Sequence, residues 1–445
     1  MSSRRCNEKV AAPYCGINFI HPTYKGKKET DGRVSEKTPR YRVVRTPLKV
    51  PEVVEAEGEL PPKLDVAGAE EVLPQQPDVV VGLHATQKAL YVHTSWPEGD
   101  RLLSLASKDQ TSFQEVPLPF KGFIAEVHAG SSSPDLTIKL QSPIESPRIY
   151  THRPGKQVTD TELQKLYSKQ FSGLDWRIVW TEKEDSTRIP FSVLHGSKLG
   201  PSQLEIYAAY NNHPDCYGRS GPHVRGFDPQ TLEQVEEYGL VDIHAYVEGG
   251  GVLGHDWYEQ GVGTNKPVAW ESLHQVGHKI GDLGIAKPVV SLVSAAGRLA
   301  PGVLARPDLF AGLVLDVATL DGVKAYTVMN PTAPFNIPEA GGTADTARGF
   351  NTMQRIHLYP QNLPSGEYMP VLGIGRLGDA RVGLGQLLKT IALAQERNTG
   401  DADILLFVTD GGHVIADLEQ LDARTVVIQT FVLRAGGHPD FQLAV

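Results

Sequence analysis

Three features are scarce or missing in this chain of 445 residues. Only three cysteines occur (Cys6, Cys15 and Cys216), too few for a disulfide framework and without the spacing of a zinc finger. No apolar run approaches the roughly 18 residues that a membrane-spanning helix needs, and no secretory hydrophobic segment follows Met1. These absences argue against an integral membrane protein or a secreted one. They predict an intracellular protein of the cytoplasm or the mitochondrion.

What is present indicates a folded protein with more than one domain. Apolar residues make up 40% of the chain, charged residues 21% and aromatic residues 7%, which excludes wholesale disorder. The length suits two or three domains. The 44 glycines and 32 prolines favour many strands and turns over a helical bundle.

Positive charge is concentrated at the N-terminal end. Residues 1–50 hold twelve Lys or Arg and four Asp or Glu, although the whole chain carries a net charge of −9. Residues 1–76 lack a sustained apolar period, so they cannot bury enough area to offset an ordering cost of roughly 1–2 kcal/mol per residue. We therefore expect an extended arm held by an acidic partner. The partner could be another protein subunit of a larger assembly, an anionic lipid or the phosphates of a nucleic acid.

Residues 77–155 have the pattern of a small antiparallel β-module. Short β-type runs recur there between turn segments such as 97–100 and 130–134. Six such strands are too few to close a propeller, which needs at least four blades. The runs are 78–83, 89–93, 101–105, 123–128, 136–140 and 148–152.

Residues 156–445 have the alternation of an α/β domain. Apolar runs typical of buried strands alternate with segments of helical period, which predicts a parallel sheet with helices on both faces. The predicted strands are 240–247, 288–294, 312–317, 369–374 and 402–408, and the predicted helices are 271–283, 299–306 and 383–397.

Several segments in order resemble the prolyl oligopeptidase family. The resemblance covers about residues 78–438 and implies an α/β-hydrolase domain preceded by the last blades of a propeller. The matching segments are 116–120 (VPLPF), 185–190 (DSTRIP), 248–261 (EGGGVLGHDWYEQG), 306–310 (RPDLF), 376–382 (RLGDARV) and 410–413 (DGGH).

The resemblance also implies the positions of a catalytic triad. An α/β-hydrolase carries a nucleophile, an acid and a histidine in that chain order, and Ser294, Asp379 and His413 follow three predicted strands in that order. Tyr210 corresponds to the family's oxyanion tyrosine and Arg381 to its substrate-binding arginine. The family's proline pocket uses a late tryptophan, but no tryptophan follows Trp270, which argues against prolyl specificity.

The segment around Ser294 departs from the pattern of a nucleophile elbow. That turn reads Gly-x-Ser-x-Gly because its strained backbone leaves little room for side chains. Here Leu292 stands at the first glycine, and counting from Pro288 puts the nucleophile at Gly297. Either Ser294 has shifted along the chain or the nucleophile is lost. We expect Leu292 to displace or bury the Ser294 hydroxyl.

Two other kinds of motif indicate a cofactor or metal only weakly. The pattern Gly-x-Gly-x-x-Gly occurs twice, at 249–254 and 373–378, but neither copy opens a clear apolar helix. His274 and His278 share a helical spacing with Glu271 nearby, without the full zinc-binding arrangement. The expectation is therefore neither a cofactor nor a metal.

Three functions stay open at the level of sequence. The favoured hypothesis is an inactive prolyl oligopeptidase-like pseudoenzyme that serves as a structural or scaffold subunit. The alternative is an active serine hydrolase or peptidase that uses Ser294, Asp379 and His413. The third is a nucleic-acid-associated factor that binds through its basic arm.

Overall fold

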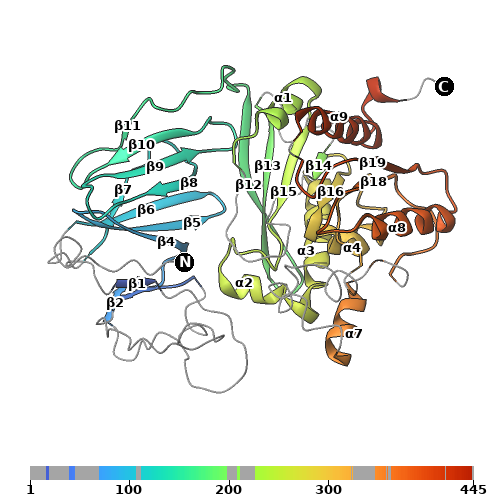
Figure 1. Cartoon of the computed structure of the whole chain (residues 1–445), viewed down its shortest axis with the longest axis horizontal. Coiled ribbons are helices and arrows are strands. Elements are labelled where there is room, and N and C mark those ends of the chain that lie inside the picture. The colour runs from blue at the N-terminus through green and yellow to red at the C-terminus, as the bar shows by residue number, and fades with distance from the viewer. Residues whose placement is uncertain are drawn as a thin grey trace. The chain divides into compact units, whose positions relative to one another are not determined.

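The computed structural model describes residues 17–19, 40–45, 70–106, 112–197, 208–210, 226–321, 323, 346–356, 358, 362–415 and 417–442. The chain forms two compact units, one of residues 1–168 with 253–255 and one of residues 169–252 with 256–445. The predicted limits of the arm and the β-module, at residues 76 and 155, stay predictions. Figure 1 traces both units from the N-terminus in blue to the C-terminus in red.

The first unit contains two four-stranded antiparallel sheets. Six of their strands match the predicted runs, and the structure adds the short edge strands β7 and β11. Neither was predicted, because two or three residues give no recognisable alternation. One sheet is β4 (Val79–Ala85), β5 (Leu90–Trp96), β6 (Gly99–Leu105) and β7 (Gln114–Val116); the other is β8 (Phe123–His128), β9 (Leu136–Gln141), β10 (Arg148–His152) and β11 (Thr159–Asp160).

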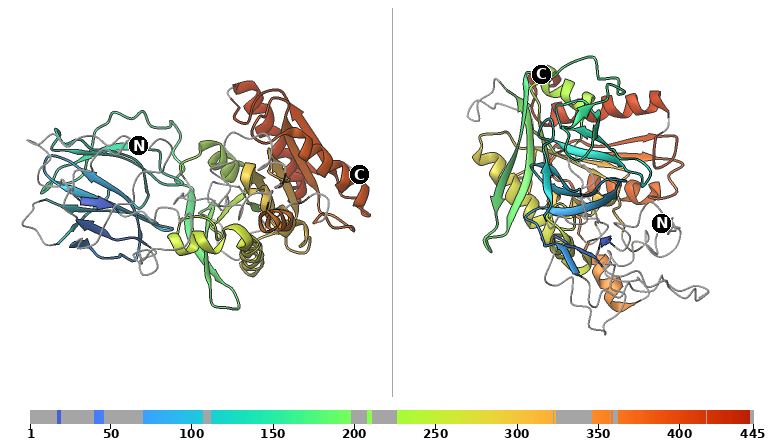
Figure 2. Two further views of the ribbon diagram at one scale, coloured as in Figure 1. Left: turned by 60° about the horizontal axis from the view of Figure 1, so that its bottom comes forward. Right: turned by 90° about the vertical axis from the view of Figure 1, so that its left-hand side faces the viewer.

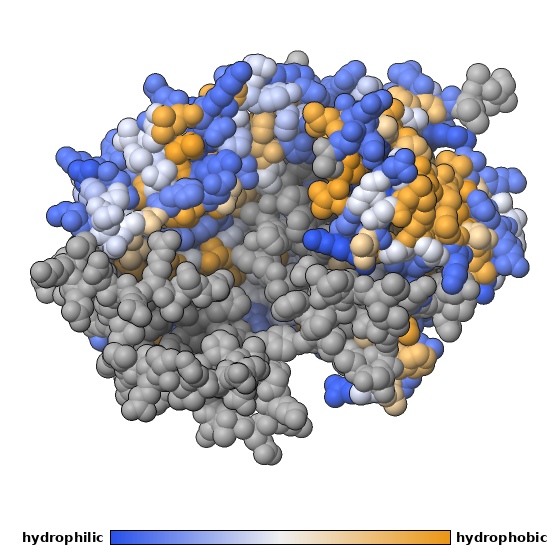
Figure 3. All heavy atoms as spheres, in the orientation of Figure 1, coloured by the Kyte–Doolittle hydropathy of each residue, from blue (hydrophilic) through white to orange (hydrophobic). Residues whose placement is uncertain are grey.

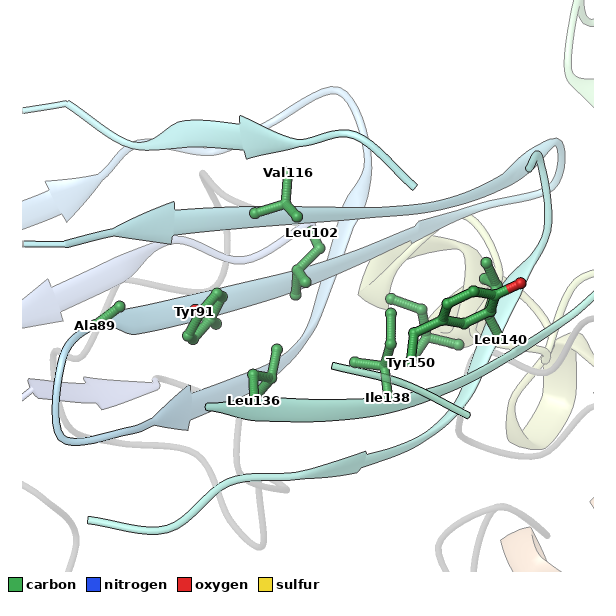
Figure 4. Close-up of a cluster of buried hydrophobic side chains, with 9 residues drawn as sticks. Ala89, Tyr91, Leu102, Val116, Leu136, Ile138, Leu140 and Tyr150 are labelled. Carbon is green, nitrogen blue, oxygen red and sulfur yellow. The ribbon is translucent and has the colours of Figure 1, made fainter. Parts of the chain in front are cut away.

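The two sheets of the first unit share a hydrophobic core. Tyr91 and Leu102 of one sheet pack with Leu136 and Ile138 of the other, and all four side chains are fully buried. Figure 4 shows these side chains between the facing strands. The Tyr91 hydroxyl also lies 2.9 Å from Nδ1 of His152, so this buried polar group has a partner within the core.

Part of the predicted arm packs on this unit. The antiparallel strands β1 (Ile17–Phe19), β2 (Val43–Arg45) and β3 (Glu70–Leu73) form a small sheet. Val43 and Leu73 lie in a buried cluster with Val80 of β4, Val92 of β5 and Leu103 of β6. Two described residues of the arm therefore contribute to a core of this unit, and the predicted extension of residues 1–76 toward a partner stays a prediction. The rest of the arm lies outside the described residues.

The second unit is built on one eight-stranded sheet in the order β12-β13-β15-β14-β16-β17-β18-β19. From β15 to β19 all neighbours are parallel, and β12 and β13 form an antiparallel hairpin at one edge. The prediction of an α/β-hydrolase-like parallel sheet is confirmed. The strands are β12 (Leu174–Glu182), β13 (Arg188–Gly196), β14 (Ala208–Tyr210), β15 (Val241–Ala245), β16 (Val289–Val293), β17 (Gly312–Asp316), β18 (Val371–Arg376) and β19 (Ile404–Thr409).

Helices cover both faces of this sheet. A Cβ on Gly312 would meet Ala435 of α9, whereas one on Gly373 would meet Ile391 of α8. Gly373 pairs with Leu315 and therefore points to the same face of the sheet as Leu315. Leu315 and Gly312 lie three positions apart on β17, so they point to opposite faces, and the two glycines do as well. Figure 2 shows the two red helices on either side of the last strands. The α-helices are α1 (Pro229–Tyr238), α2 (His255–Gln260), α3 (Val268–Asp282), α4 (Ala300–Leu304), α7 (Ala347–Arg355), α8 (Leu384–Arg397) and α9 (Leu418–Ala435).

Local sequence explains where the helices α1 and α9 begin. The Asp228 side chain accepts a hydrogen bond from the Gln230 N–H, with Pro229 as the first helical residue of α1. The Asp417 side chain likewise accepts from the Gln420 N–H at the start of α9. Within the described part of the chain, no helix is both long and apolar enough to cross a membrane.

Candidate active site

A continuous chain of hydrogen bonds joins three loops at the carboxyl ends of parallel strands. Oγ of Ser294 lies 2.9 Å from Nε2 of His413, and Nδ1 of His413 lies 2.8 Å from Oδ2 of Asp379. Ser294 directly follows β16, Asp379 follows β18 and His413 follows β19. This is the edge of an open parallel sheet where ligands bind. The predicted proximity of Asp379 and His413 is confirmed.

The carboxylate of Asp379 is fixed by its own loop. Its Oδ1 accepts the backbone N–H groups of Arg381 and Val382, both at 2.9 Å, which leaves Oδ2 for the imidazole. A carboxylate at Nδ1 favours the tautomer with a proton on that nitrogen. Nε2 of His413 is then free to accept the proton of the Ser294 hydroxyl.

Ser294 occupies a strained turn. Its φ angle is +52°, in the left-handed region, and it opens the 3-10 helix η3 (Ser294–Leu299). Such a conformation costs a non-glycine residue of order 1–3 kcal/mol and is concentrated at functional sites. The carbonyl of Ser294 accepts the Thr319 N–H at 2.7 Å, so the loop after β17 holds the turn in place. The result is a hydroxyl directed away from the strand toward His413.

We expected the Ser294 hydroxyl to be displaced or buried: it is not displaced from His413, but Ser294 is buried, at 9% exposed. Leu292 is 2% exposed within β16, so its side chain fills the core instead of crowding the turn. The close approach occurs at Gly297, where a Cβ would lie 2.7 Å from the Thr319 nitrogen. The position at which this turn needs a small residue therefore lies three positions past the serine. Gly297 is the position that counting from Pro288 gave for the nucleophile.

Two further candidate residues lie near the same edge. The backbone of Tyr210 pairs with Ile243 and Val290 at the end of β14, but its side chain is outside the described part of the structure. Arg381 is exposed, and its backbone N–H is bound to Asp379. Their roles in binding an oxyanion and a substrate stay predictions.

A buried group of charges supports the histidine loop, and sequence reasoning did not single it out. Nη1 of Arg376 donates to the His413 carbonyl oxygen at 2.6 Å, and Nη2 of Arg376 lies 3.3 Å from Oδ1 of Asp316. Nε of Arg424 lies 2.8 Å from Oδ2 of the same carboxylate. The one available signal was Arg376, an arginine that ends an apolar strand. Asp316 lies 60 positions from Arg376 and 108 from Arg424, so no local pattern connects the three residues.

Contacts in the structure account for the two histidines and for one glycine of the weak metal and cofactor motifs. Nε2 of His274 lies 2.7 Å from the Gly302 carbonyl, and Nε2 of His278 lies 3.2 Å from Arg306. A Cβ on Gly375 would lie 2.3 Å from Leu384 of α8, so close helix packing accounts for that glycine. Within the described ranges, no three His, Cys, Asp or Glu side chains are arranged to hold a metal ion.

Comparisons with known proteins agree with this architecture. Residues 225–437 match the model of the prolyl oligopeptidase family. The prolyl endopeptidase-like protein of Rattus norvegicus is 25% identical over 323 residues, covering 66% of this chain and 42% of the relative. That of Xenopus laevis is 28% identical over 233 residues, covering 48% of this chain and 29% of the relative. The chain thus spans less than half the length of these curated relatives.

Solved structures show the same fold. Prolyl oligopeptidase B from Galerina marginata superposes with a TM-score of 0.76 at 16% identity, covering 91% of this chain and 55% of that one. Oligopeptidase B from Leishmania major gives a TM-score of 0.71 at 20% identity, covering 82% of this chain and 53% of that one. These structures show the fold, and the match to the family model shows that residues 225–437 form a prolyl oligopeptidase family domain.

Proposed function

We propose that this protein is a serine hydrolase of the peptidase type, with Ser294 as nucleophile, His413 as general base and Asp379 as the group that orients the histidine. The observation that carries the proposal is the unbroken series of hydrogen bonds from the Ser294 hydroxyl through His413 to Asp379. A serine is a weak nucleophile unless a base lies within hydrogen-bond reach. His413 lies within this reach of Ser294, and Asp379 orients the imidazole.

The geometry supports an acyl-transfer mechanism. Oγ of Ser294 attacks the substrate carbonyl carbon while His413 Nε2 takes the hydroxyl proton, and His413 then gives that proton to the leaving group. Water attacks the resulting acyl-enzyme with His413 again as base, which releases the acid and restores Ser294. Asp379 keeps its hydrogen bond to Nδ1 throughout and stabilises the charged imidazole.

Stabilisation of the oxyanion needs preorganised donors. The N–H of Ala295, directly after the nucleophile in the first turn of η3, is one candidate. Backbone N–H groups in a first helical turn have no acceptor within the helix. Tyr210 is the proposed second donor, and Arg381 the proposed contact to a substrate carbonyl.

The proposed substrates are peptides or small esters. The curated relatives are called prolyl endopeptidase-like, which favours peptide bonds near proline as the first class to examine. The lack of a tryptophan after Trp270 argues against a proline pocket of the family's usual kind. A screen should therefore include non-proline peptides and p-nitrophenyl esters.

The proposal is tested by labelling with a fluorophosphonate probe, which reports an activated serine without knowledge of the substrate. We expect the wild-type chain to be labelled and Ser294→Ala to lose the label completely. Ser291→Ala is the matched control, because Ser291 is a serine of the preceding strand that is equally buried, and it should label like the wild type. A folded wild-type protein that takes up no label would refute the proposal.

A noncatalytic scaffold subunit is the second candidate function. It is favoured by apolar side chains exposed on the edge strand β19, namely Leu405, Leu406 and Val408. Figure 3 shows hydrophobic surface over the end of the sheet where β18 and β19 lie. Exposed apolar surface on a sheet edge is typical of a contact with another chain. Assembly without fluorophosphonate labelling would favour this function.

The partner and the compartment of the protein stay predictions. An acidic partner surface for the basic residues 1–50 is tested by deleting that segment and measuring whether assembly weakens. Binding to nucleic acid would fall steeply with salt and would disappear in the same deletion.

A further inference from the structure

Two arginines share one buried carboxylate beneath the histidine loop. Asp316 is the last residue of β17. Its Oδ2 accepts hydrogen bonds from Nε and Nη2 of Arg424 of α9, at 2.8 Å and 2.5 Å, and its Oδ1 lies 3.3 Å from Nη2 of Arg376 of β18. The side chains of Asp316 and Arg376 are 2% and 4% exposed, and that of Arg424 is 22% exposed. Two guanidinium groups and one carboxylate give the group a net positive charge, and solvent screens the two most buried of these side chains only weakly.

This arrangement is costly as a device for stability alone. Burying each ion costs several kcal/mol, and apolar residues of similar volume often stabilise a protein as well or better. Burial lowers the pKa of Arg376, and the charge of Asp316 opposes that shift. Asp316 thus offsets part of the cost of keeping Arg376 charged inside the unit.

Arg376 connects the two loops that carry the acid and the base. It ends β18, three residues before Asp379, and its Nη1 donates to the carbonyl oxygen of His413. The N–H of Gly378 donates to the Gly411 carbonyl at 2.9 Å. The Arg376 guanidinium thus adds to the backbone hydrogen bond and to the His413–Asp379 contact that hold the histidine loop against the acid loop. The Arg376 guanidinium also contacts Oδ1 of Asp316, and Arg424 contacts Oδ2 of the same carboxylate.

We propose that Asp316 and Arg424 are positioning residues, which hold Arg376 against the main chain of His413 and so keep the imidazole aligned between Ser294 and Asp379. They act through Arg376 and touch neither the substrate nor the reacting atoms. The inference rests on the proposed function, because it assigns these residues to the same triad.

A cavity beside Arg424 makes a sharp test possible. Its volume is about 150 Å³, and its lining includes Asp242, Ser291, Asp316, Arg424 and Gln429, between the sheet and the helices α1 and α9. Removing the Arg424 side chain would enlarge this space next to Oδ2 of Asp316. Free guanidinium is small enough to enter this space. It can replace the lost side-chain cation, because two of its N–H groups can pair with a carboxylate.

The experiment compares three variants of the full chain by their rate of fluorophosphonate labelling. Arg424→Ala should label about 10- to 100-fold more slowly, because small displacements of a catalytic group cost factors of this size. The loss should fall on the maximal rate of inactivation and leave the affinity for the probe unchanged. Millimolar guanidinium should restore part of the rate. Arg424→Lys, which keeps the charge without the fork, should lie in between.

Arg434→Ala is the matched control. Arg434 lies on the same helix and pairs with Asp403 at 2.6 Å in an exposed salt bridge, which is worth little. It should label at the wild-type rate with or without guanidinium. If Arg424→Ala also labels at the wild-type rate, or if guanidinium fails to speed it selectively, the positioning role is refuted.

Hydrogen exchange separates this inference from the proposed function. Peptides that span residues 410–415 should exchange faster in Arg424→Ala than in the wild type or in Arg434→Ala, whether or not the serine reacts. An unlabelled wild type would refute the proposed function, and unchanged exchange in Arg424→Ala would refute the positioning role.

Discussion

At the scale of single residues, the sequence predicted that Asp379 and His413 lie together, but not that the Ser294 hydroxyl lies within hydrogen-bond distance of His413. Asp379 and His413 lie in loops whose glycines and flanking residues are local features of the sequence. The position of the Ser294 hydroxyl depends instead on the packing of Leu292 in the core and on the close contact of Gly297 with the loop after β17. The 2.7 Å approach of Gly297 to Thr319 joins two different strand ends, so no pattern within the segment could reveal it.

The first prediction concerns this close approach. In Gly297→Ala the new Cβ would also meet Ala318 and the Thr319 oxygen at 2.8 Å, so the turn that carries Ser294 must shift. We expect a loss of about 1–3 kcal/mol in the free energy of unfolding and at least tenfold slower fluorophosphonate labelling. Gly281→Ala is the control, because nothing lies within 4 Å of a Cβ there and alanine is the better helix former. Labelling of Gly297→Ala at the wild-type rate would show that the turn tolerates the methyl group.

At the scale of helices and strands, length did not decide what was predicted, because the nine-residue strands β12 and β13 and the 18-residue helix α9 were missed. The predicted apolar runs became β15 to β19, and the helical segments became α3, α4 and α8. The strands β7 and β11 have three and two residues, and only their neighbours in the sheet make them strands. The same holds for β2, whose residues pair with β3 across more than 20 positions of the chain.

The second prediction follows from the packing of β2. Val43 is fully buried against Leu73 and Val92, so Val43→Ala should lower the free energy of unfolding of the first unit by about 1–3 kcal/mol. Hydrogen exchange of peptides from β4 to β6 in increasing urea would measure this loss. Val426→Ala is the matched control, because that valine is 59% exposed and its loss should change stability by less than about 0.5 kcal/mol. An unchanged first unit in Val43→Ala would show that β2 adds little to the stability of this unit and would favour a role of residues 1–76 in binding a partner.

At the scale of the whole molecule, the fold class was predictable because a periodic pattern is repeated many times over the chain. The ion group of Asp316, Arg376 and Arg424 was not, since each of its members comes from a different element. Two neighbouring buried histidines of the first unit differ in how they are partnered. In the first unit, Nε2 of His84 is buried without a hydrogen-bond partner among the described atoms, whereas His93 beside it lies 2.7 Å from Asp100.

The third prediction is that acid weakens the first unit through His84. Burial, together with the nearby His93, lowers the pKa of His84 to about 4 from the usual 6.5. Between these two pH values the unfolded chain binds a proton that the folded unit excludes, so the free energy of unfolding falls as the pH falls from 6.5 to 4. The loss attributable to His84 should reach roughly 2–3 kcal/mol, since each unit of pKa corresponds to about 1.4 kcal/mol. His84→Gln should flatten this dependence, measured by urea unfolding followed through hydrogen exchange of peptides from β4 to β6. His128→Gln, at an exposed site, should keep the wild-type slope.

The second unit provides an internal control. The burial of His274 lowers its pKa as well, so the second unit should keep its own loss of stability in acid when His84 is replaced. An equal slope in His84→Gln and the wild type would show that the His84 imidazole is protonated in the folded unit as readily as in the unfolded chain.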